Sequence, residues 1–546
     1  MLKKILAMLL AASVLTGALA ACSGNDSGKD NDREEERDRD DDDDEDEDED
    51  EDKKPSDTTV VVSGDMTLDV NGPSMEDEDN SGYKPSGTGH YTEIMTEPFE
   101  DDDPSFSDNF VDADFEGREF KFLHYGESAY DFHDRYIWND GYASGVIEEA
   151  VAERNKLVEE KYNVKITAEE CAPMSEARKR IQAGMTDFNL IYEWGIRSNG
   201  AALDGMLYDF HDLDYVDFTQ SYWVPSAIEG LTVADKMFVA TNMISMNSIS
   251  WAGMYFFNKM LMDKLNFSYP YDYVDAGNWT YDVVLAMCLK AEEDVNGDGI
   301  WDRNDQYGGI DGDIILAGAC DAPLYEANDD GSYKLIPYTE GMVAAYDQYK
   351  DKTASVRNLD VLEFTEGADI SMFPSEYAAA IFLSFGEDHY LFMNGSLDMT
   401  KEFENMKSDY GVAPVPVAKA GDDYSTGVDY CAPMFSMPVT LEDPDMTAII
   451  MEYMAYESER LLLPAYYETT LKIKRMQDTR DYVMLDIIRD SIKYDWTVIY
   501  MWDSGLNEMR SQMLAAGNFT SVAKKWGPKC QAQIDETIEK IRLFGY

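Results

Sequence analysis

Alternating hydrophobic and polar residues mark the start of a folded body, and residues at helical spacing follow them. The segment "REFKFLHYG" (118–126) alternates as a half-buried strand does. In "SGVIEEAVAERNKLVEEKYNVKITAEE" (144–170), apolar residues recur at helical spacing until Asn163 and then give way to a second strand. A further helix, "MSEARKRIQAGM", and a third strand, "TDFNLIYEWG", come next. This order predicts a parallel sheet covered by helices, with ligands bound beyond the carboxyl ends of the strands.

A short apolar run near the start of the chain has the pattern of a secretory signal peptide. Lys3 and Lys4 precede "ILAMLLAASVLTGALAAC", which ends in small residues. The run is too short and too early for a membrane span. Its end, "LAAC", resembles the lipobox of bacterial lipoproteins, in which the cysteine is diacylated, and two acyl chains anchor a protein stably. We therefore expect a signal peptide in residues 1–21 and a lipid anchor at Cys22 on the outer face of the cell membrane. An ordinary cleavage site beside a chance cysteine is the alternative.

Residues 22–115 have the composition of a disordered acidic tether. Their run "DREEERDRDDDDDEDEDEDED" has almost nothing to bury and repels itself. The whole chain has 45 Lys and Arg against 109 Asp and Glu, a net charge of −64. Phosphate backbones would repel such a chain, so nucleic acid is not expected as a partner. The 546 residues favour two domains after the tether.

Several segments after residue 118 resemble, in the same order, parts of extracellular solute-binding proteins, the two-lobed receptors of ABC importers. They are "AVAERNKLVEEKYNVKI", "MLYDFHDLDYVDFTQSYW", "DKMFVATNM" with "GMYFFNKMLMDKL", "NWTYDVVLAMCLKAEEDVNGDGIWDRNDQYGG", "SDYGVAPVPVAKAGDDY" and "ERLLLPAYYETTLKIKRMQDTRDYVMLDII". The resemblance implies an α/β fold of the periplasmic-binding-protein type II, with two lobes joined by hinge crossover strands. It implies lobe 1 in residues 116–256 and 411–460, and lobe 2 in residues 257–410 and 461–546. It also implies an oligosaccharide or other sugar as the ligand, and a monomer.

Aromatic residues beside polar ones at strand ends are candidates for a sugar site. Flat rings stack on the C–H faces of sugars, and hydroxyl groups need acceptors and donors. Trp194 ends the third strand, where the resemblance to maltodextrin-type receptors implies a tryptophan. The expected ligand-binding residues are Trp194, Arg197, Asn247, Trp251, Glu387, Asp388, Tyr430 and Trp502. Core packing is the alternative for each tryptophan.

The segment "EDVNGDGIWDRND" (293–305) has the spacing of an EF-hand calcium loop. Oxygen donors stand at positions 1, 3, 5, 7, 9 and 12, with a glycine, Gly299, at the sharp turn of position 6. The expected ligands of a structural Ca²⁺ ion are Asp294, Asn296, Asp298, the Ile300 carbonyl, Asp302 and Asp305. Asp305 replaces the usual glutamate, so bidentate coordination at position 12 is in doubt. A polar turn held by Asx hydrogen bonds is the alternative.

The sequence contains no motif of a hydrolase nucleophile, a zinc protease or a P-loop. A non-enzymatic receptor that binds a solute and delivers it to an ABC permease is therefore the leading interpretation. A surface glycoside hydrolase is the first alternative, because acidic residues are abundant and such enzymes need two carboxylates. A receptor that reports its ligand to a membrane sensor kinase is the second.

Overall fold

The computed structural model describes residues 110–125, 136–138, 145–185, 187–328, 330–429, 432–472, 478–500 and 505–544, excepting the side chains of 468–472. The expected signal peptide, Cys22 and nearly all of the expected tether lie outside these ranges, as do Tyr430 and Trp502. None of the helices in the described ranges is both long and apolar enough to cross a membrane.

The first lobe is built on a four-stranded sheet of order β10-β3-β1-β2. The strands are β1 (Arg118–His124), β2 (Val164–Glu170), β3 (Leu190–Trp194) and β10 (Pro433–Ser436). Strands β1, β2 and β3 are parallel, as the sequence predicts, whereas β10 is antiparallel to β3. The expected alternation in β1 buries Phe120 and Phe122 fully. The α/β class is thereby confirmed for this lobe.

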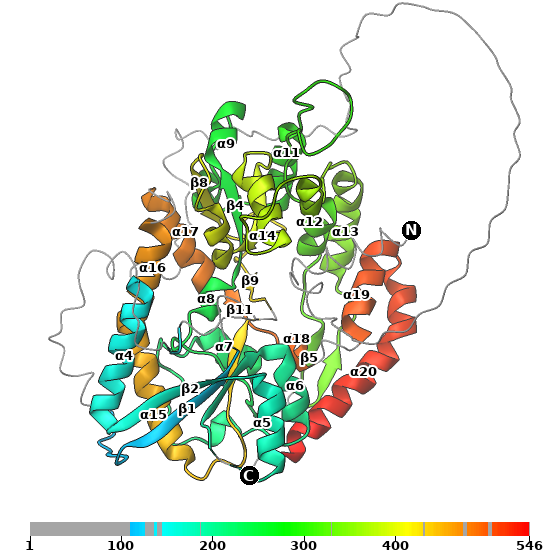
Figure 1. Ribbon diagram of the computed structural model, residues 1–546. Helices are drawn as coiled ribbons and strands as arrows, with labels where there is room; N and C mark the ends of the chain where they lie inside the picture. Colours follow the sequence, from blue (N-terminus) through cyan, green and yellow to red (C-terminus); the bar gives the residue numbers. More distant parts are fainter. Residues whose placement is uncertain are drawn as a thin grey trace, which may run out of the picture.

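Helices cover the sheet of the first lobe (Figure 1). They are α4 (Val146–Tyr162), α5 (Pro173–Gln182), α6 (Gly195–Leu203), η1 (Phe210–Asp212), α7 (Pro225–Leu231), α15 (Pro444–Glu457) and η5 (Ser458–Leu462). Helix α4 ends at Asn163, which has a left-handed backbone conformation with φ of 47°. Asparagine tolerates this conformation better than most residues, which explains why the helical pattern stops there.

The second lobe has a smaller, antiparallel sheet of order β7-β4-β8. Its strands are β4 (Gly253–Asn258), β7 (Phe392–Ser396) and β8 (Tyr410–Ala413). Around them lie α9 (Lys259–Leu265), α10 (Pro270–Asp275), α11 (Tyr281–Ala291), α12 (Gly312–Ala319), α13 (Glu340–Thr353), η2 (Val361–Thr365), α14 (Glu376–Ile381), η3 (Phe382–Gly386) and η4 (Leu397–Phe403). A hairpin of β5 (Tyr325–Ala327) and β6 (Tyr333–Leu335) projects from this lobe toward the first (Figure 1).

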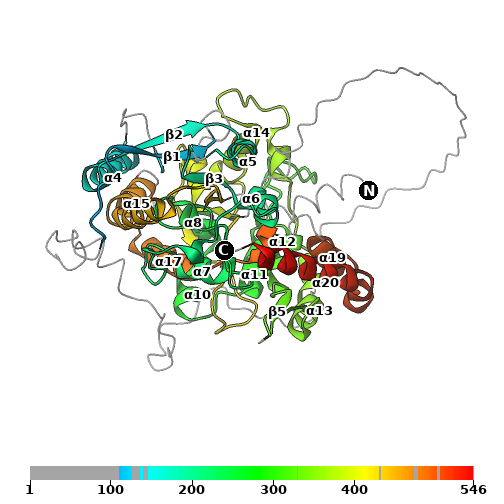
Figure 2. The same cartoon turned by 90° about the horizontal axis from the view of Figure 1, so that it is seen from below.

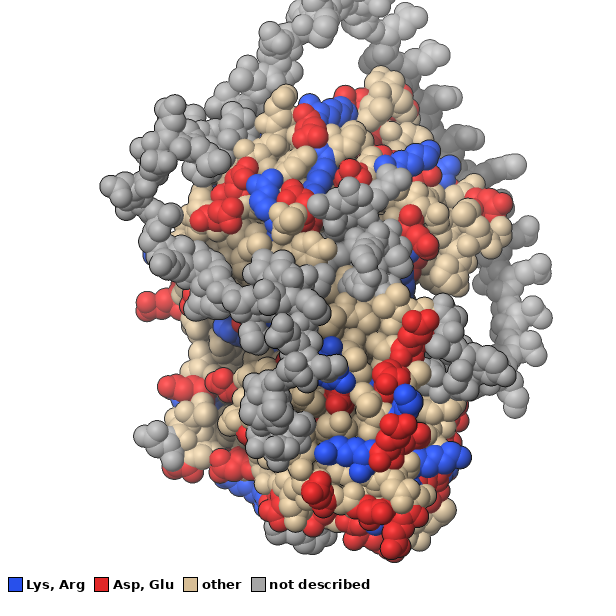
Figure 3. Space-filling view, turned by 90° about the vertical axis from the view of Figure 1, so that its left-hand side faces the viewer, with Lys and Arg blue, Asp and Glu red and all other residues tan. Residues whose placement is uncertain are grey.

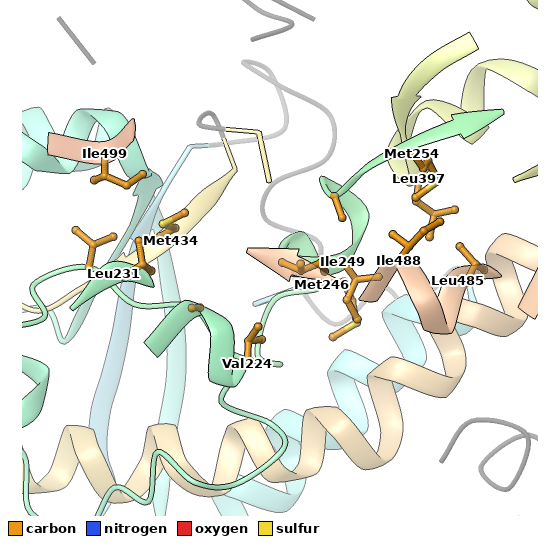
Figure 4. Close-up of a cluster of buried hydrophobic side chains, with 14 of the residues drawn as sticks. Val224, Leu231, Met246, Ile249, Met254, Leu397, Met434, Leu485, Ile488 and Ile499 are labelled. Atoms are coloured by element: carbon orange, nitrogen blue, oxygen red, sulfur yellow. The ribbon is translucent and has the colours of Figure 1, made fainter. Parts of the chain in front are cut away.

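The chain first passes between the lobes through two crossing segments. The chain leaves lobe 1 through α8 (Asn247–Ser250) and enters β4, and it returns from β8 through residues 414–432, which include β9 (Thr426–Gly427). The crossings pair with each other, because Ala252 forms a β-bridge with Val428. Figure 4 shows buried apolar side chains near this place, among them Met246, Ile249 of α8 and Met254 of β4, and all three belong to the hydrophobic core.

The C-terminal part of the chain alternates between the lobes. It consists of α16 (Leu463–Lys472), α17 (Thr479–Asp490), β11 (Ile492–Lys493), α18 (Trp496–Tyr500), α19 (Gly505–Ala516) and α20 (Phe519–Leu543). Helices α16 and α18 pack on α4 and α6 of lobe 1, whereas α17 packs on β8 of lobe 2. The expected assignment of 461–546 to lobe 2 therefore does not match these contacts. The error arose because a helical pattern shows which face is apolar but not which lobe covers it.

The β5–β6 hairpin forms a further bridge between the lobes. Trp496 of α18, only 1% exposed, packs its ring centroid 5.1 Å from that of Tyr325 and 5.4 Å from that of Tyr333. The Ala234 amide of lobe 1 donates a hydrogen bond to the Tyr333 hydroxyl (3.1 Å). The hairpin is thus fixed to lobe 1 although it belongs to lobe 2.

Candidate functional site

The carboxyl ends of β1 and β3 lie side by side at the edge of the first sheet that faces the crossing segments. The two strands are parallel and adjacent, so Tyr125, just after β1, and Trp194, the last residue of β3, reach the same edge. Trp194 also pairs with Pro433, the first residue of β10, which follows the second crossing. This is the edge at which α/β sheets bind ligands.

Four side chains form a compact cluster at this edge. The guanidinium carbon of Arg197 lies 4.1 Å from the centroid of the Trp194 ring and 5.5 Å from that of Tyr125. Arg197 donates a hydrogen bond to the Tyr125 hydroxyl, and its Nη1 lies 4.0 Å from Oε1 of Glu193. The Arg197 side chain is 36% exposed, whereas that of Glu193 is 1% exposed. The Arg197 guanidinium and the partly exposed Tyr125 are therefore the groups of this cluster that a ligand could reach.

Glu193 is the buried member of the cluster. Its carboxylate accepts hydrogen bonds from the amides of Trp194 (2.9 Å) and Met174 (3.2 Å). Burial raises the pKa of Glu193, and its backbone hydrogen bonds and the Arg197 charge oppose that rise. A carboxylate held in this way fixes the end of β3 and orients Arg197. Glu193 and Tyr125 were missed by sequence reasoning, although their positions at the ends of parallel strands were a usable signal.

Trp194 and Asn247 are less accessible than the sequence-based expectation required. Trp194 is 2% exposed and carries Arg197 on its ring, and Asn247 is fully buried and donates a hydrogen bond to the Tyr192 hydroxyl. A sugar cannot stack on a ring that is already covered. The expected stacking role of Trp194 is therefore corrected: its buried ring packs against Arg197, and Arg197 is the residue exposed at the surface.

Trp251 lies in the first crossing, at the end of α8, and is partly exposed. Its carbonyl accepts a hydrogen bond from the Asp429 amide (3.1 Å), and the Ala432 carbonyl accepts one from the Gly195 amide (3.3 Å). Asp429 is thus bonded beside Trp251, and Ala432 is bonded beside Trp194. The structure brings the neighbourhoods of these two expected residues to the same crossing.

Glu387 and Asp388 lie at the opposite end of the second sheet. The Asp388 carboxylate accepts hydrogen bonds from Nδ2 of Asn258 (2.6 Å) and Oγ of Ser408 (2.8 Å). Asn258 ends β4, whereas the crossings meet β4 at Gly253, about 17 Å away along a strand of this length. Glu387 and Asp388 therefore do not fit an interlobe site. The expectation failed because β7 runs antiparallel to β4, so the residues before it point away from lobe 1.

The loop after α11 has the turns of an EF-hand-type loop. The Asp294 carboxylate accepts hydrogen bonds from the amides of Gly297 (2.7 Å) and Gly299 (2.9 Å). Both glycines have positive φ, 70° and 76°, which explains the need for glycine at these positions. The buried carboxylate of Asp305 accepts from the amides of Val295 (3.0 Å) and Asp302 (2.9 Å) and so closes the loop.

The carboxylates of this loop are of the kind that binds a hard cation such as Ca²⁺. Carboxylates accept up to about four hydrogen bonds or metal contacts, so the amide bonds leave lone pairs available on Asp294 and Asp305. However, in the described ranges no group of three or more His, Cys, Asp or Glu side chains is gathered closely enough for a metal ion. The calcium loop stays a prediction.

A small cavity of about 110 Å³ lies away from the crossings, between lobe 1 and the end of α20. It is lined by Gly205, Leu207, Tyr208, Asp209, Asp212, Phe238, Val439, Leu543 and Phe544. Its walls belong to no expected site. On the face of the molecule in Figure 3, acidic and basic side chains are interspersed over both lobes.

Comparisons with known proteins give a likeness of fold. No model of a protein family matches the chain, and no curated protein matches it. Similar solved structures include the maltose/maltodextrin-binding domain MalE from Bdellovibrio bacteriovorus bound to maltotriose (14% identity, 78% of this chain and 99% of that chain, TM-score 0.42). Others are a cyclo/maltodextrin-binding protein complexed with maltotetraose (12%, 78% and 97%, TM-score 0.46) and a de novo designed esterase (13%, 77% and 99%, TM-score 0.49).

Proposed function

We propose that this chain is a cell-surface solute-binding lipoprotein that captures an extracellular carbohydrate between its lobes. In this proposal it is anchored through Cys22 on the outer face of the cell membrane, and it passes the unaltered solute to the transmembrane subunits of an ABC permease. The observation that carries the proposal is the contact of Arg197 with Tyr125 at the carboxyl ends of β1 and β3, the edge of the parallel sheet next to the crossings.

The chemistry of these groups suits a neutral ligand rich in hydroxyl groups. The guanidinium of Arg197 offers several N–H donors in a fixed plane, and the partly exposed Trp251 offers an aromatic ring. The buried carboxylate of Glu193 holds Arg197 without itself reaching the ligand. No bond of the ligand needs to be made or broken for this role.

Closure in this proposal is a hinge motion of the two crossings. Residues 251–253 pair with residues 427–429, so the two crossings move together. A ligand that contacts both lobes binds the closed form better and shifts the population toward it.

A thermal-shift screen tests the proposal directly. The soluble body is heated with a panel of mono- and oligosaccharides, with Ca²⁺ present, and a bound sugar raises the melting temperature as its concentration exceeds its dissociation constant. At least one sugar is expected to shift the transition and to be recovered intact. The appearance of new reducing ends would instead support a glycoside hydrolase, and no shift with any sugar would contradict the proposal.

Replacing Trp251 with alanine is expected to weaken binding of the sugar found in the screen by about 1–3 kcal/mol, because a stacking surface is lost. Isothermal titration calorimetry measures the change. Trp301→Ala is the matched control, since Trp301 is also partly exposed and belongs to the loop after α11. Equal losses in both variants would show that Trp251 has no special role.

We propose also that residues 294–305 bind a structural Ca²⁺ ion. After treatment with a chelator, the melting temperature is expected to rise on addition of Ca²⁺, because an ion that binds only the folded chain stabilises it. Asp298→Asn should reduce this rise, since it removes one charge from the donor set while leaving an oxygen in place. A melting temperature that does not respond to Ca²⁺ would remove the proposal without affecting the sugar site.

A further inference from the structure

Helix α20 carries a face with only positive charge in a chain that is otherwise strongly acidic. Lys524, Lys525 and Lys529 are exposed on it, and we call these three residues the basic face. Residues 509–534 include no Asp or Glu, although the whole chain has 109 of them and a net charge of −64. In Figure 1 and Figure 2, α19 and α20 lie together at the right-hand edge of the molecule. The basic face is therefore open to a partner that is itself negative.

The folded body does not neutralise the charges of the basic face. In the part of the chain that the structure describes, none of its three lysines forms an ion pair with a carboxylate. The Nζ atoms of Lys525 and Lys529 lie 5.3 Å and 5.1 Å from the centroid of the Trp526 ring, so one ring holds two ammonium groups. Oε1 of Gln512 on α19 accepts hydrogen bonds from the Trp526 indole (2.9 Å) and from Lys525 (3.3 Å). Like charges gathered in this way repel each other, and a bound anion relieves the repulsion.

The same chain contains a segment of matching chemistry. Residues 40–52, "DDDDDEDEDEDED", are all acidic. Residues 53–109 separate this run from Phe110, where the described part of the chain begins. A coil of that length spans about 40 Å on average, and about 190 Å at full extension. A folded body of this size has a radius of gyration of about 22 Å, so the run can reach the basic face from Phe110.

A segment of the same chain has an advantage over other negative partners. A connection of this length gives two binding groups an effective concentration on the order of 1 mM, so even a weak contact is populated. A membrane of anionic lipids, or a second copy of the chain, must instead approach against the net charge of −64. Charge and connectivity together favour residues 40–52 as the occupant of the basic face.

We infer that residues 40–52 of the chain dock on the basic face of α20. Carboxylates of the run pair with the ammonium groups of the three lysines, and no fixed register is needed because neighbouring carboxylates can replace one another. Salt weakens the contact, since the paired charges are exposed. Docking folds the segment before the body back onto α20 and so brings Cys22 closer to the body. The inference does not depend on what the two lobes bind.

Zero-length cross-linking of the whole chain from residue 22 onward tests the inference, with Cys22→Ser to prevent lipidation. A carbodiimide joins a lysine amine to a carboxylate that touches it, and mass spectrometry identifies the linked peptides. Links from the basic face to residues 40–52 are expected in about 20 mM salt and should fall at least about fivefold in about 500 mM salt. Lys165, Lys290 and Lys419 are the matched control in the same sample, because they are also exposed and form no ion pair in the described ranges. They should link to the run far less.

Small-angle scattering of two variants in low salt gives a second readout. Replacing all three lysines of the basic face with glutamine is expected to increase the maximum dimension by on the order of 20 Å, because the run is released. Replacing the three control lysines with glutamine removes the same charge and should leave the dimension unchanged. Melting curves confirm that both variants fold.

Each other result overturns the inference. Equal linking of all six lysines would show attraction without a docking site, and an unchanged dimension after loss of the basic face would show that the run is not held there. Links that form between two copies, detected by mixing isotope-labelled and unlabelled chains, would assign the basic face to a second copy. Lysine-dependent binding to phosphatidylglycerol vesicles, without links to residues 40–52, would assign it to a membrane.

Discussion

Replacing Arg154 with methionine is expected to lower the free energy of unfolding by about 3–5 kcal/mol. Arg154 is fully buried in α4, and its guanidinium donates to the carbonyls of Tyr136 (2.8 Å), Ile137 (2.8 Å) and Ile244 (3.0 Å). It also donates to Oγ of Ser458 (3.1 Å). Methionine keeps much of the volume but leaves these acceptors without donors, which is the costly part. Chemical denaturation measures the loss.

Arg154 holds separate parts of the lobe 1 core together, because its partners come from three places in the chain. Burial disfavours the charged form of its guanidinium and lowers the pKa of that group to about 9. The group is still charged at neutral pH, and its hydrogen bonds hold residues 136 and 137 in place. Arg118→Met is the matched control, because Arg118 forms an exposed ion pair with Asp443 (2.6 Å) and its loss is expected to cost about 0–1 kcal/mol. Equal stability of the two variants would contradict the role given to Arg154.

Replacing Trp496 with alanine is expected to cost about 3–5 kcal/mol of stability, as large-to-small changes in a core do. The effect should go beyond stability, since Trp496 is the residue on which the β5–β6 hairpin of lobe 2 rests against lobe 1. Small-angle scattering is expected to show a more open average shape in the unliganded variant. Sugar affinity should fall, because more of the population must be closed by the ligand.

Trp526→Ala provides the comparison for Trp496. Trp526 is partly buried on α20, and its indole N–H donates to Oε1 of Gln512 on α19 (2.9 Å), within one helical hairpin. Its loss should lower stability less and leave the scattering curve unchanged. An unchanged curve for Trp496→Ala, with stability reduced, would show that the hairpin packs on lobe 1 without restraining it.

The first half of lobe 1 was predictable because its signals are local. Alternation in β1, helical spacing in α4 and the stop at Asn163 all depend on residues within one turn or strand of each other. The same holds for Trp194 at the end of β3. Its burial was not predictable, because it depends on Arg197 folding back from the first turn of α6 onto the ring.

The errors in lobe 2 came from information that is not local. Glu387 and Asp388 follow an apolar run and precede a strand, as a site residue would, but strand direction decides which end of the sheet they occupy. That direction is set by pairing with β4, more than a hundred residues earlier in the chain.

The path of the last helices has a consequence for how the chain matures. Helix α20 begins beside Tyr346 of lobe 2 and ends with Phe544 against Gly205 of lobe 1, where any side chain at Gly205 would collide with the ring. Neither lobe can complete its packing until α20 has docked against both of them. Such long-range contacts slow folding and leave partly packed forms exposed. We conclude that the protein acquires protease resistance in a late folding step, when α20 joins the two lobes.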